Sequence, residues 1–143
     1  MPTNSDLLLF DTSAALAYVD AASPLHHQVR RAAEGAARGL SGHAVFEFLS
    51  VTTRLPPPMR ISAADAALLV RREFPESRFL PVAQSGALIA EFARRSIAGG
   101  MIYDGLVAAC SRHHELTLLS CDRRAEDTYR LLGAPYRLIA SDA

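Results

Sequence analysis

The sequence predicts an α/β fold, with a short, mostly parallel central sheet flanked by helices on both faces. Short apolar runs alternate along the chain with segments of helical periodicity, an order typical of parallel sheets that are covered on both sides. The 143 residues are 50% hydrophobic, which suits a folded domain with a hydrophobic core. No internal repeat or long linker divides the chain. We therefore expect a single domain over residues 1–143, with its core at about 7–139.

The first part of the chain predicts two strands and three helices. Asp11 ends the first apolar run, and Thr12 or Ser13 is expected to cap the helix that follows. Ser23 and Pro24 have the residue order of a helix start. The expected elements are a strand at 7–10, a helix at 12–20, a helix from 23 to about 37, a strand at 39–42 and a helix at 43–55.

The remaining elements follow from capping residues, glycines and prolines. Prolines 56–58 stop the preceding helix, and Ser62 with Asp65 predicts the start of the next one. Glycines 99–100 break the chain, and Gly133 ends the last helix. The expected elements are a helix from 62 to about 73, a strand at 78–82, helices at 84–96 and 102–114, a strand at 117–121, a helix at about 125–132 and a strand at 136–140.

The charged residues exclude several classes of activity. Fifteen acids balance fifteen bases, so the charge of the whole molecule does not favour capture of nucleic acid, although local patches remain open. All fifteen of these bases are arginine. The absence of lysine excludes a Walker A loop, a Schiff base and a lysine-assisted phospho-acceptor aspartate.

The sequence also predicts the environment of the protein. Cys110 and Cys121 are the two cysteines, too few for a disulfide framework, and they suit a reducing compartment. The start, MPTNSDLLLF, has no basic region, and its apolar run is too short for a signal peptide. No stretch reaches the roughly 18 apolar residues that span a bilayer. We expect a cytoplasmic protein with no membrane partner.

Four acids are expected at one edge of the sheet. Asp11 and Asp122 stand at the ends of two predicted strands, and Glu47 and Asp104 lie in the first turns of helices after glycine-containing breaks. Sites in open α/β sheets form beyond the carboxyl ends of the strands. Each acid also has a structural alternative, as an N-cap (Asp11, Asp122), a solvent-facing side chain (Glu47) or a partner of the helix dipole (Asp104). The placement of all four at one edge favours a functional site.

These acids lie in four motifs that occur in a fixed order: FDTSAALAYVD, VFEFLSV, IYDGLVAAC and LLSCDRR. Together the motifs resemble the PIN-domain ribonucleases, and in particular the VapC-type toxins of bacterial toxin–antitoxin pairs. The resemblance covers nearly the whole chain, from residue 7 to about 139. It implies a PIN-like domain in which the catalytic acids are Asp11, Glu47, Asp104 and Asp122.

The resemblance and the residue types together indicate a metal site. Carboxylates and water suit hard ions such as Mg²⁺ and Mn²⁺. We expect Asp11, Asp104 and Asp122 to bind the metal directly or through water, and Glu47 to bind it or to orient the attacking water. Arg124 stands where many relatives have a further acid.

Neighbouring polar residues are candidates for supporting roles. The hydroxyls of Thr12, Ser13 and Ser120 are expected to support the metal ligands, and Ser120 occupies the place of a family Thr or Ser; N-capping is the alternative for the first two. Arg123 and Arg124 flank the fourth acid and are candidates to hold RNA phosphates; ordinary solvated arginines are the alternative.

The expected function is that of a Mg²⁺- or Mn²⁺-dependent endoribonuclease toxin of a type II toxin–antitoxin pair. The resemblance implies cleavage of phosphodiester bonds in structured RNA such as tRNA, a cognate VapB-like antitoxin and a homodimer. Two other functions stay open. One is a Mg²⁺-dependent phosphohydrolase with Asp11 as nucleophile, although Ser13 replaces the second acid of its usual D-x-D start. The other is a non-catalytic module whose acids hold an ion or a basic peptide.

Two further site types find little support in the sequence. Cys110, His114 and Cys121 suggest a zinc site, but a fourth ligand is not evident. A Ser-His-Asp hydrolase is disfavoured because the chain has no G-x-S-x-G motif.

Overall fold

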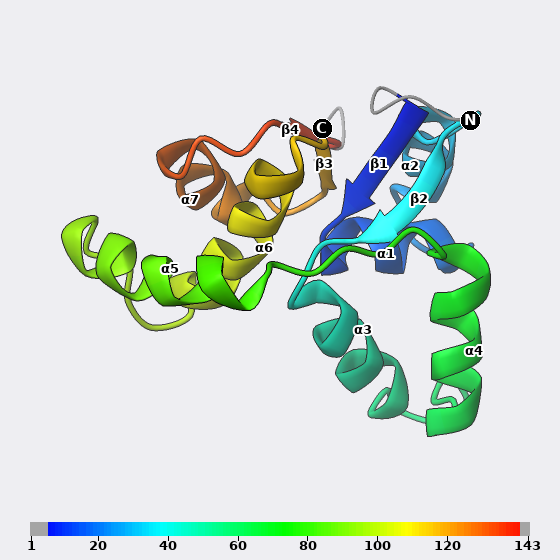
Figure 1. Cartoon of the computed structure of the whole chain (residues 1–143). Coiled ribbons are helices and arrows are strands. Elements are labelled where there is room, and N and C mark those ends of the chain that lie inside the picture. Colours follow the sequence, from blue (N-terminus) through cyan, green and yellow to red (C-terminus); the bar gives the residue numbers. More distant parts are fainter. Residues whose placement is uncertain (1–5, 141–143) are drawn as a thin grey trace.

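A computed structural model describes residues 6–140 of the chain. Two terminal segments of the expected domain, residues 1–5 and 141–143, lie outside the described residues. The first of them begins the stretch MPTNSDLLLF, which the sequence predicts is not a signal peptide. The described residues contain one sheet of four parallel strands in the order β2-β1-β3-β4 (Figure 1). The strands are β1 (Leu7–Phe10), β2 (Ala37–Leu40), β3 (Leu118–Ser120) and β4 (Tyr136–Leu138). The α/β fold class predicted from the sequence is confirmed.

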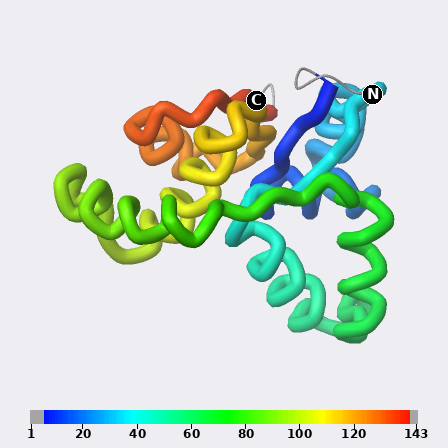
Figure 2. The backbone as a smooth tube through the Cα atoms, viewed as in Figure 1, coloured from blue at the N-terminus to red at the C-terminus, as the bar shows by residue number. Residues whose placement is uncertain are grey.

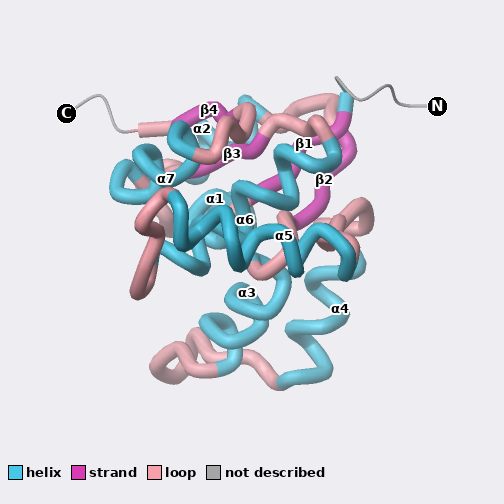
Figure 3. The backbone as a smooth tube through the Cα atoms, turned by 60° about the vertical axis from the view of Figure 1, so that its left-hand side comes forward, coloured by secondary structure: helices cyan, strands magenta, loops and turns pink. Residues whose placement is uncertain are grey.

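Helices surround this sheet. They are α1 (Thr12–Val19), α2 (His26–Ala32), α3 (Ala44–Thr53), α4 (Ala63–Glu73), α5 (Val82–Arg94), α6 (Met101–His114) and α7 (Glu126–Leu131), with a 3₁₀ turn, η2, at Arg123–Ala125. Figure 2 shows that α5 extends away from the sheet and that α3 and α4 form a pair of their own. In Figure 3, α5 lies in front of α6, the helix against which it packs. No helix in the described part of the chain is long and apolar enough to cross a membrane.

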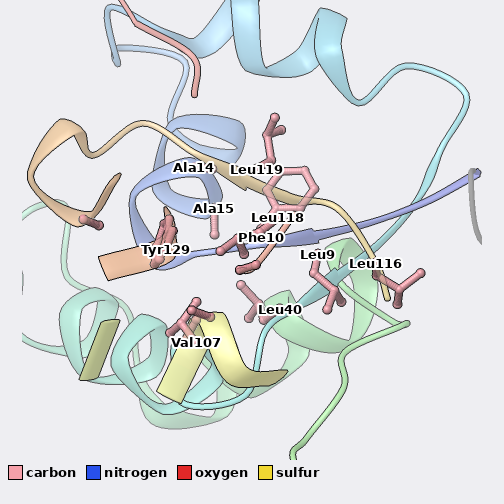
Figure 4. Packing of buried hydrophobic residues seen from close by; sticks show 14 of the residues in the cluster. Leu9, Phe10, Ala14, Ala15, Leu40, Val107, Leu116, Leu118, Leu119 and Tyr129 are labelled. Carbon is pink, nitrogen blue, oxygen red and sulfur yellow. The ribbon is translucent and has the colours of Figure 1, made fainter. Parts of the chain in front are cut away.

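The hydrophobic core lies on both faces of the two central strands. Leu9 and Phe10 of β1 and Leu118 and Leu119 of β3 have no exposed surface. Figure 4 shows α1 and α2 on one side of these strands and α6 on the other. Because both faces are covered, nearly every position of the central strands is apolar. The expectation of helices on both faces is therefore met.

The order of the strands places a site at one edge of the sheet. The chain runs from β1 outward to β2, and then crosses back to add β3 and β4 on the other side of β1. Connections therefore leave β1 and β3 in opposite directions, and a crevice forms beyond the carboxyl ends of these two strands. Asp11 follows β1 directly, and Asp122 lies two residues after the end of β3.

One predicted strand does not form. Residues 78–82 were expected as a strand, but this segment makes only a single bridge to the residue after β2. The N–H of Leu40 donates to the hydroxyl of Ser77 (2.9 Å) instead of a backbone carbonyl, which interrupts the ladder. Pro81, which has no N–H to donate, then serves as the N-cap of α5. The prediction was wrong because the hydrogen bond of the Ser77 hydroxyl and the missing N–H of Pro81 outweighed the apolar pattern.

The boundaries of α2 also differ from the prediction. The helix begins at His26 and ends at Ala32, whereas the sequence predicted residues 23 to about 37. The hydroxyl of Ser23 accepts a bond from the N–H of Leu25 (3.4 Å), so it closes the turn before the helix. Gly35 adopts a left-handed conformation (φ 78°) in the turn that leads into β2, so the chain cannot continue as a helix.

Candidate active site

All four predicted acids line one cavity of about 200 Å³ beyond the carboxyl edge of the sheet. Asp11 follows β1, Glu47 is in the first turn of α3, Asp104 is in the first turn of α6, and Asp122 precedes η2. The fold brings them together from four separate segments of the chain. The complete lining is Asp11, Thr12, Ser13, Leu16, Glu47, Val51, Asp104, Val107, Asp122 and Tyr129.

Asp11 is the most deeply buried of these acids, with 4% of its surface exposed. Its Oδ1 accepts hydrogen bonds from Ser13 Oγ (2.6 Å) and from the N–H of Ala14 (3.0 Å). Asp11 is therefore the N-cap of α1, and the expectation that Thr12 or Ser13 caps this helix was wrong. Burial raises the pKa of Asp11, and the hydrogen bonds that the carboxylate accepts oppose this rise. The residue combines a structural contact with a place in the cavity.

Asp104 shows most clearly that the acids interact. Burial, followed by the negative charges of Asp122, Asp11 and Glu47, raises the pKa of Asp104 to about 6 from its ordinary 3.8. The N-cap of α6 is Gly100, and no side chain caps this helix. Asp104 therefore faces three like charges without capping a helix.

Two hydroxyls connect the loop after β3 to the cavity. Ser13 Oγ accepts a bond from the N–H of Cys121 (2.8 Å) while it donates to Asp11. Ser120, which has no exposed surface, accepts a bond from the N–H of Asp122 (3.0 Å). Asp122 in turn caps the 3₁₀ turn η2. These bonds hold the ends of β1 and β3 in a fixed relation.

The other predicted residues lie in different places. Thr12 lines the cavity and is 8% exposed. Arg123 and Arg124 are exposed and do not line it. The side chain of Arg124 is 94% exposed, and its Nε lies 3.5 Å from Oδ1 of Asp122. Both arginines are therefore beside the cavity rather than within it.

Tyr129 of α7 is a residue of the cavity that sequence reasoning missed. It is 1% exposed, and its hydroxyl donates to Oδ2 of Asp11 (2.8 Å). The available signal was its position seven residues after Asp122, about two helical turns further on. An aromatic residue in an apolar helix pattern normally indicates core packing, so this signal did not distinguish the residue.

Among residues 6–140, no group of three or more His, Cys, Asp or Glu side chains is arranged to hold a metal ion. Two of the residues considered for zinc have backbone partners instead: Cys110 Sγ lies 3.3 Å from the carbonyl of Arg78, and His114 Nε2 lies 2.9 Å from the carbonyl of Phe79. A zinc site is therefore not supported.

The chain is similar to several known proteins. The PIN-domain family matches residues 8–131. Ribonuclease VapC27 of Mycobacterium tuberculosis (strain ATCC 25618 / H37Rv) is 35% identical over 126 residues, which cover 88% of this chain and 92% of that protein. Ribonuclease VapC40 of Mycobacterium tuberculosis (strain CDC 1551 / Oshkosh) is 33% identical over 102 residues, or 70% of this chain and 75% of that protein.

A solved structure shares the fold. The crystal structure of FitAcB from Neisseria gonorrhoeae matches with a TM-score of 0.60 and 18% identity, over 90% of this chain and 95% of that chain. Together with the strand order, the cavity of four acids and the sequence matches, this likeness leads to one conclusion. The chain belongs to the PIN-domain family and, within it, to the VapC-type ribonucleases.

Proposed function

We propose that this protein is the endoribonuclease toxin of a type II toxin–antitoxin pair and that it cleaves structured RNA such as tRNA. The observation that carries the proposal is the cavity in which Asp11, Glu47, Asp104 and Asp122 lie together. Relatives that are named ribonucleases, similar over most of the chain, support the same class of reaction. We also propose that residues 1–143 act as one domain.

Mg²⁺ or Mn²⁺ is the proposed cofactor. The donors around the cavity are carboxylate and hydroxyl oxygens, which hard divalent ions prefer. Such an ion keeps several waters and contacts one or two carboxylates, so part of its contact with the acids would run through water. Asp11, Asp104, Asp122 and Glu47 would hold it directly or through water. When bound, the ion supplies an activated water and positive charge for the leaving oxygen.

The side chains around the cavity have separate tasks in this proposal. Glu47 accepts a hydrogen bond from the attacking water and orients it towards the phosphodiester. The negative charges of the acids repel phosphate, so the substrate has to be held by cations outside the cavity. Arg123 and Arg124 are exposed beside Asp122 and hold the phosphates on either side of the scissile bond.

The geometry favours this function over a phosphohydrolase with an aspartate nucleophile. A nucleophilic carboxylate has to approach phosphorus closely. Oδ1 of Asp11 is committed to the cap of α1, and only 4% of the residue is exposed, so a phosphate ester, which is larger than a metal ion, has little access to this carboxylate. The lysine that this chemistry usually requires is absent from the whole chain.

An antitoxin is the second proposed partner. A cavity that carries four acids and no cation in its lining attracts a guanidinium. We propose that the cognate VapB-like antitoxin inserts an arginine there, because a guanidinium can pair with carboxylates in a bidentate manner and exclude the metal.

A homodimer completes the proposed assembly. We call the exposed apolar surface of α3, α5 and the segment before α5 the dimer face; its residues are Phe46, Phe79, Val82 and Ile89, which are 59%, 51%, 90% and 76% exposed. The rings of Phe46 and Phe79 lie 6.0 Å apart, and Val82 and Ile89 are two helical turns apart on one side of α5. Exposed apolar groups of this kind mark interaction sites on soluble proteins.

The test of the proposed function is cleavage of RNA by the purified protein. Folded tRNA and the small ester p-nitrophenyl phosphate are incubated separately with Mg²⁺, with Mn²⁺ or with a chelator. We expect internal cuts in tRNA with either metal, none with the chelator, and no hydrolysis of the small ester. Hydrolysis of the ester without cleavage of RNA would favour the phosphohydrolase, and activity on neither would favour a binding module.

A further inference from the structure

A buried phenol is in direct contact with the acid that caps α1. The hydroxyl of Tyr129 lies 2.8 Å from Oδ2 of Asp11, although the two residues are 118 positions apart in the sequence. Tyr129 also lines the cavity that holds the four acids. The bond therefore links α7 to the end of β1 at the centre of the proposed site.

The proton of this bond belongs to the tyrosine. The hydroxyl is the donor in the 2.8 Å contact with Oδ2, and a phenol with its ordinary pKa of about 10 carries its proton at neutral pH. The phenol therefore stays neutral, and its O–H donates to the carboxylate. In this hydrogen bond Tyr129 of α7 is the donor and Oδ2 of Asp11 is the acceptor.

The remaining contacts of Asp11 show which of its two oxygens can contact a ligand. Oδ1 accepts from Ser13 Oγ (2.6 Å) and from the N–H of Ala14 (3.0 Å), which uses both of its lone pairs. Oδ2 accepts from Tyr129 and is the oxygen that keeps acceptor capacity. The buried Ser120 hydroxyl also lowers the pKa of Asp11, and its own oxygen accepts a bond from the N–H of Asp122. A ligand that enters the cavity therefore meets Asp11 through Oδ2.

The ring of Tyr129 cannot follow a moving carboxylate. It is 1% exposed and packs within the core, where Figure 4 shows it near the end of β1. It also makes an edge contact with the ring of Tyr136, at 5.9 Å between centroids. Side chains packed in this way stay in one conformation. The donor is thus in place before any ligand arrives.

We propose that Tyr129 is a positioning residue that orients Oδ2 of Asp11 for a single contact with a divalent ion; the proposal rests on the proposed function. In this arrangement Oδ1 caps α1, and Oδ2 is the oxygen that would contact the ion. Partners that orient a metal ligand commonly change metal affinity by about 10- to 100-fold when they are removed. Loss of the phenol oxygen should therefore weaken metal binding even though the fold is kept.

The test compares two variants that each remove one phenol oxygen from a neighbouring ring. Tyr129→Phe removes the donor to Asp11, whereas Tyr136→Phe removes a hydroxyl that bonds with Glu126 and Arg130. Mn²⁺ binding is measured without RNA, by electron paramagnetic resonance of the free ion. We expect the Kd of Tyr129→Phe to rise about 10-fold and that of Tyr136→Phe to stay within about 2-fold of the parent. RNA cleavage by Tyr129→Phe should recover at a correspondingly higher metal concentration.

A second measurement uses the parent and does not depend on how well the variant folds. The chain has four tyrosines and no tryptophan. Titration with Mg²⁺ should change the tyrosine absorbance of the parent and of Tyr136→Phe, because the ion draws charge from the acceptor of the Tyr129 bond. An unchanged Mn²⁺ affinity in folded Tyr129→Phe, or metal binding by the parent without a tyrosine signal, would overturn the positioning role alone. A parent that neither binds Mn²⁺ nor cleaves RNA would overturn the proposed function and this role together.

Discussion

Asp11 and Asp122 show that a residue that caps a helix can also line the cavity of the proposed active site. Asp11 caps α1 and Asp122 caps η2, as the structural alternatives required, yet both also line the cavity. Asp104 differs from them, because it caps no helix and lies among like charges. Substitution of Asp104 is therefore the cleanest test at the scale of a single residue.

We predict that Asp104→Asn unfolds at a higher temperature than the parent when a chelator is present. Removal of one charge from the group should stabilise the fold by about 1 kcal/mol, which corresponds to a few degrees. With saturating Mn²⁺ the difference between the two unfolding temperatures should shrink or change sign, since the parent gains more stability from the metal. Thermal melts with and without Mn²⁺ provide the measurement. Two results together would contradict a metal site at Asp104: a variant that is less stable than the parent in chelator, and a parent whose unfolding temperature does not change with metal.

The same pair of proteins should differ with pH. The pKa of Asp104 is about 6 in the folded protein and 3.8 in the absence of the fold. Because the folded pKa is the higher one, ionisation of Asp104 costs stability as the pH rises from about 4 to about 6, and the cost stays constant above that. In chelator, the advantage of Asp104→Asn should therefore be small at pH 4 and full at pH 7.5. An advantage that is the same at both pH values would show that Asp104 does not titrate in this window.

The sequence predicted the four acids but not Tyr129, the residue that donates a hydrogen bond to Asp11. The four acids were recognisable because strand ends and first helical turns place all four at one predicted edge of the sheet, in motifs that resemble those of the family. Tyr129 recurs at helical spacing with Ala125 and Leu132, a position where an aromatic residue normally indicates core packing. Its contact with Asp11 depends on how α7 packs, which the local sequence does not encode.

At the scale of elements, α5 depends on an ion pair for its position. Arg112 of α6 donates two hydrogen bonds to Glu91 of α5, at 2.8 and 2.9 Å. These bonds lower the pKa of Glu91 to about 2 from its ordinary 4.5, and Arg95 adds to the effect. Leu88 and Phe92 bury the adjacent face of the helix. The same contact holds in place the part of α5 that carries the exposed Val82 and Ile89.

We predict that Glu91→Gln lowers the free energy of unfolding by about 1–2 kcal/mol at pH 7. The folded pKa of Glu91 is depressed, so the stability from this group is present above about pH 4.5 and is lost as the pH falls towards about 2. The difference between parent and variant should therefore be much smaller at pH 2.5 than at pH 7. Urea denaturation at pH 7 and at pH 2.5 measures it, with exposed Glu34→Gln as the control. An equal loss of stability at the two pH values would contradict the role of the charge.

Element boundaries were predictable where a capping residue acts alone. Ser62 accepts a bond from the N–H of Asp65 (3.0 Å) and starts α4 as expected. The prediction failed at residues 78–82, where the hydroxyl of Ser77 replaces a ladder partner of Leu40. Gly39 adds a constraint that no pattern reveals, because a side chain there would overlap the backbone carbonyl of Glu76. Such contacts between distant segments exist only once the sheet is assembled.

At the scale of the whole molecule, the alternation of apolar runs and helices gave the α/β class, but the order of the strands required the structure. That order is what collects four acids from four segments at one edge. The exposed apolar groups are a second property of the whole fold. They occur on α5 and also on α4, where Leu68 is 48% exposed, so exposure alone does not identify an interface.

We predict that Ile89→Glu converts a dimer into a monomer, whereas Leu68→Glu leaves the dimer intact. A charge on the dimer face would be buried without a partner in the assembly, which opposes association. Light scattering after size-exclusion chromatography gives the mass of each protein at matched concentration. A dimer that persists in Ile89→Glu and dissociates in Leu68→Glu would place the interface on α4 instead.

The central claim is that the four acids form one centre that cleaves RNA. Its most direct test is the rate of tRNA cleavage at saturating Mn²⁺ for the parent and for Asp11→Asn, Asp104→Asn and Asp122→Asn. Asp127→Asn, which changes a side chain that is 91% exposed on α7, serves as the control. Each of the three variants should melt as a folded protein and lose cleavage by at least about 100-fold, while Asp127→Asn should keep the rate of the parent. Folded variants that all retain the parental rate would contradict the central claim.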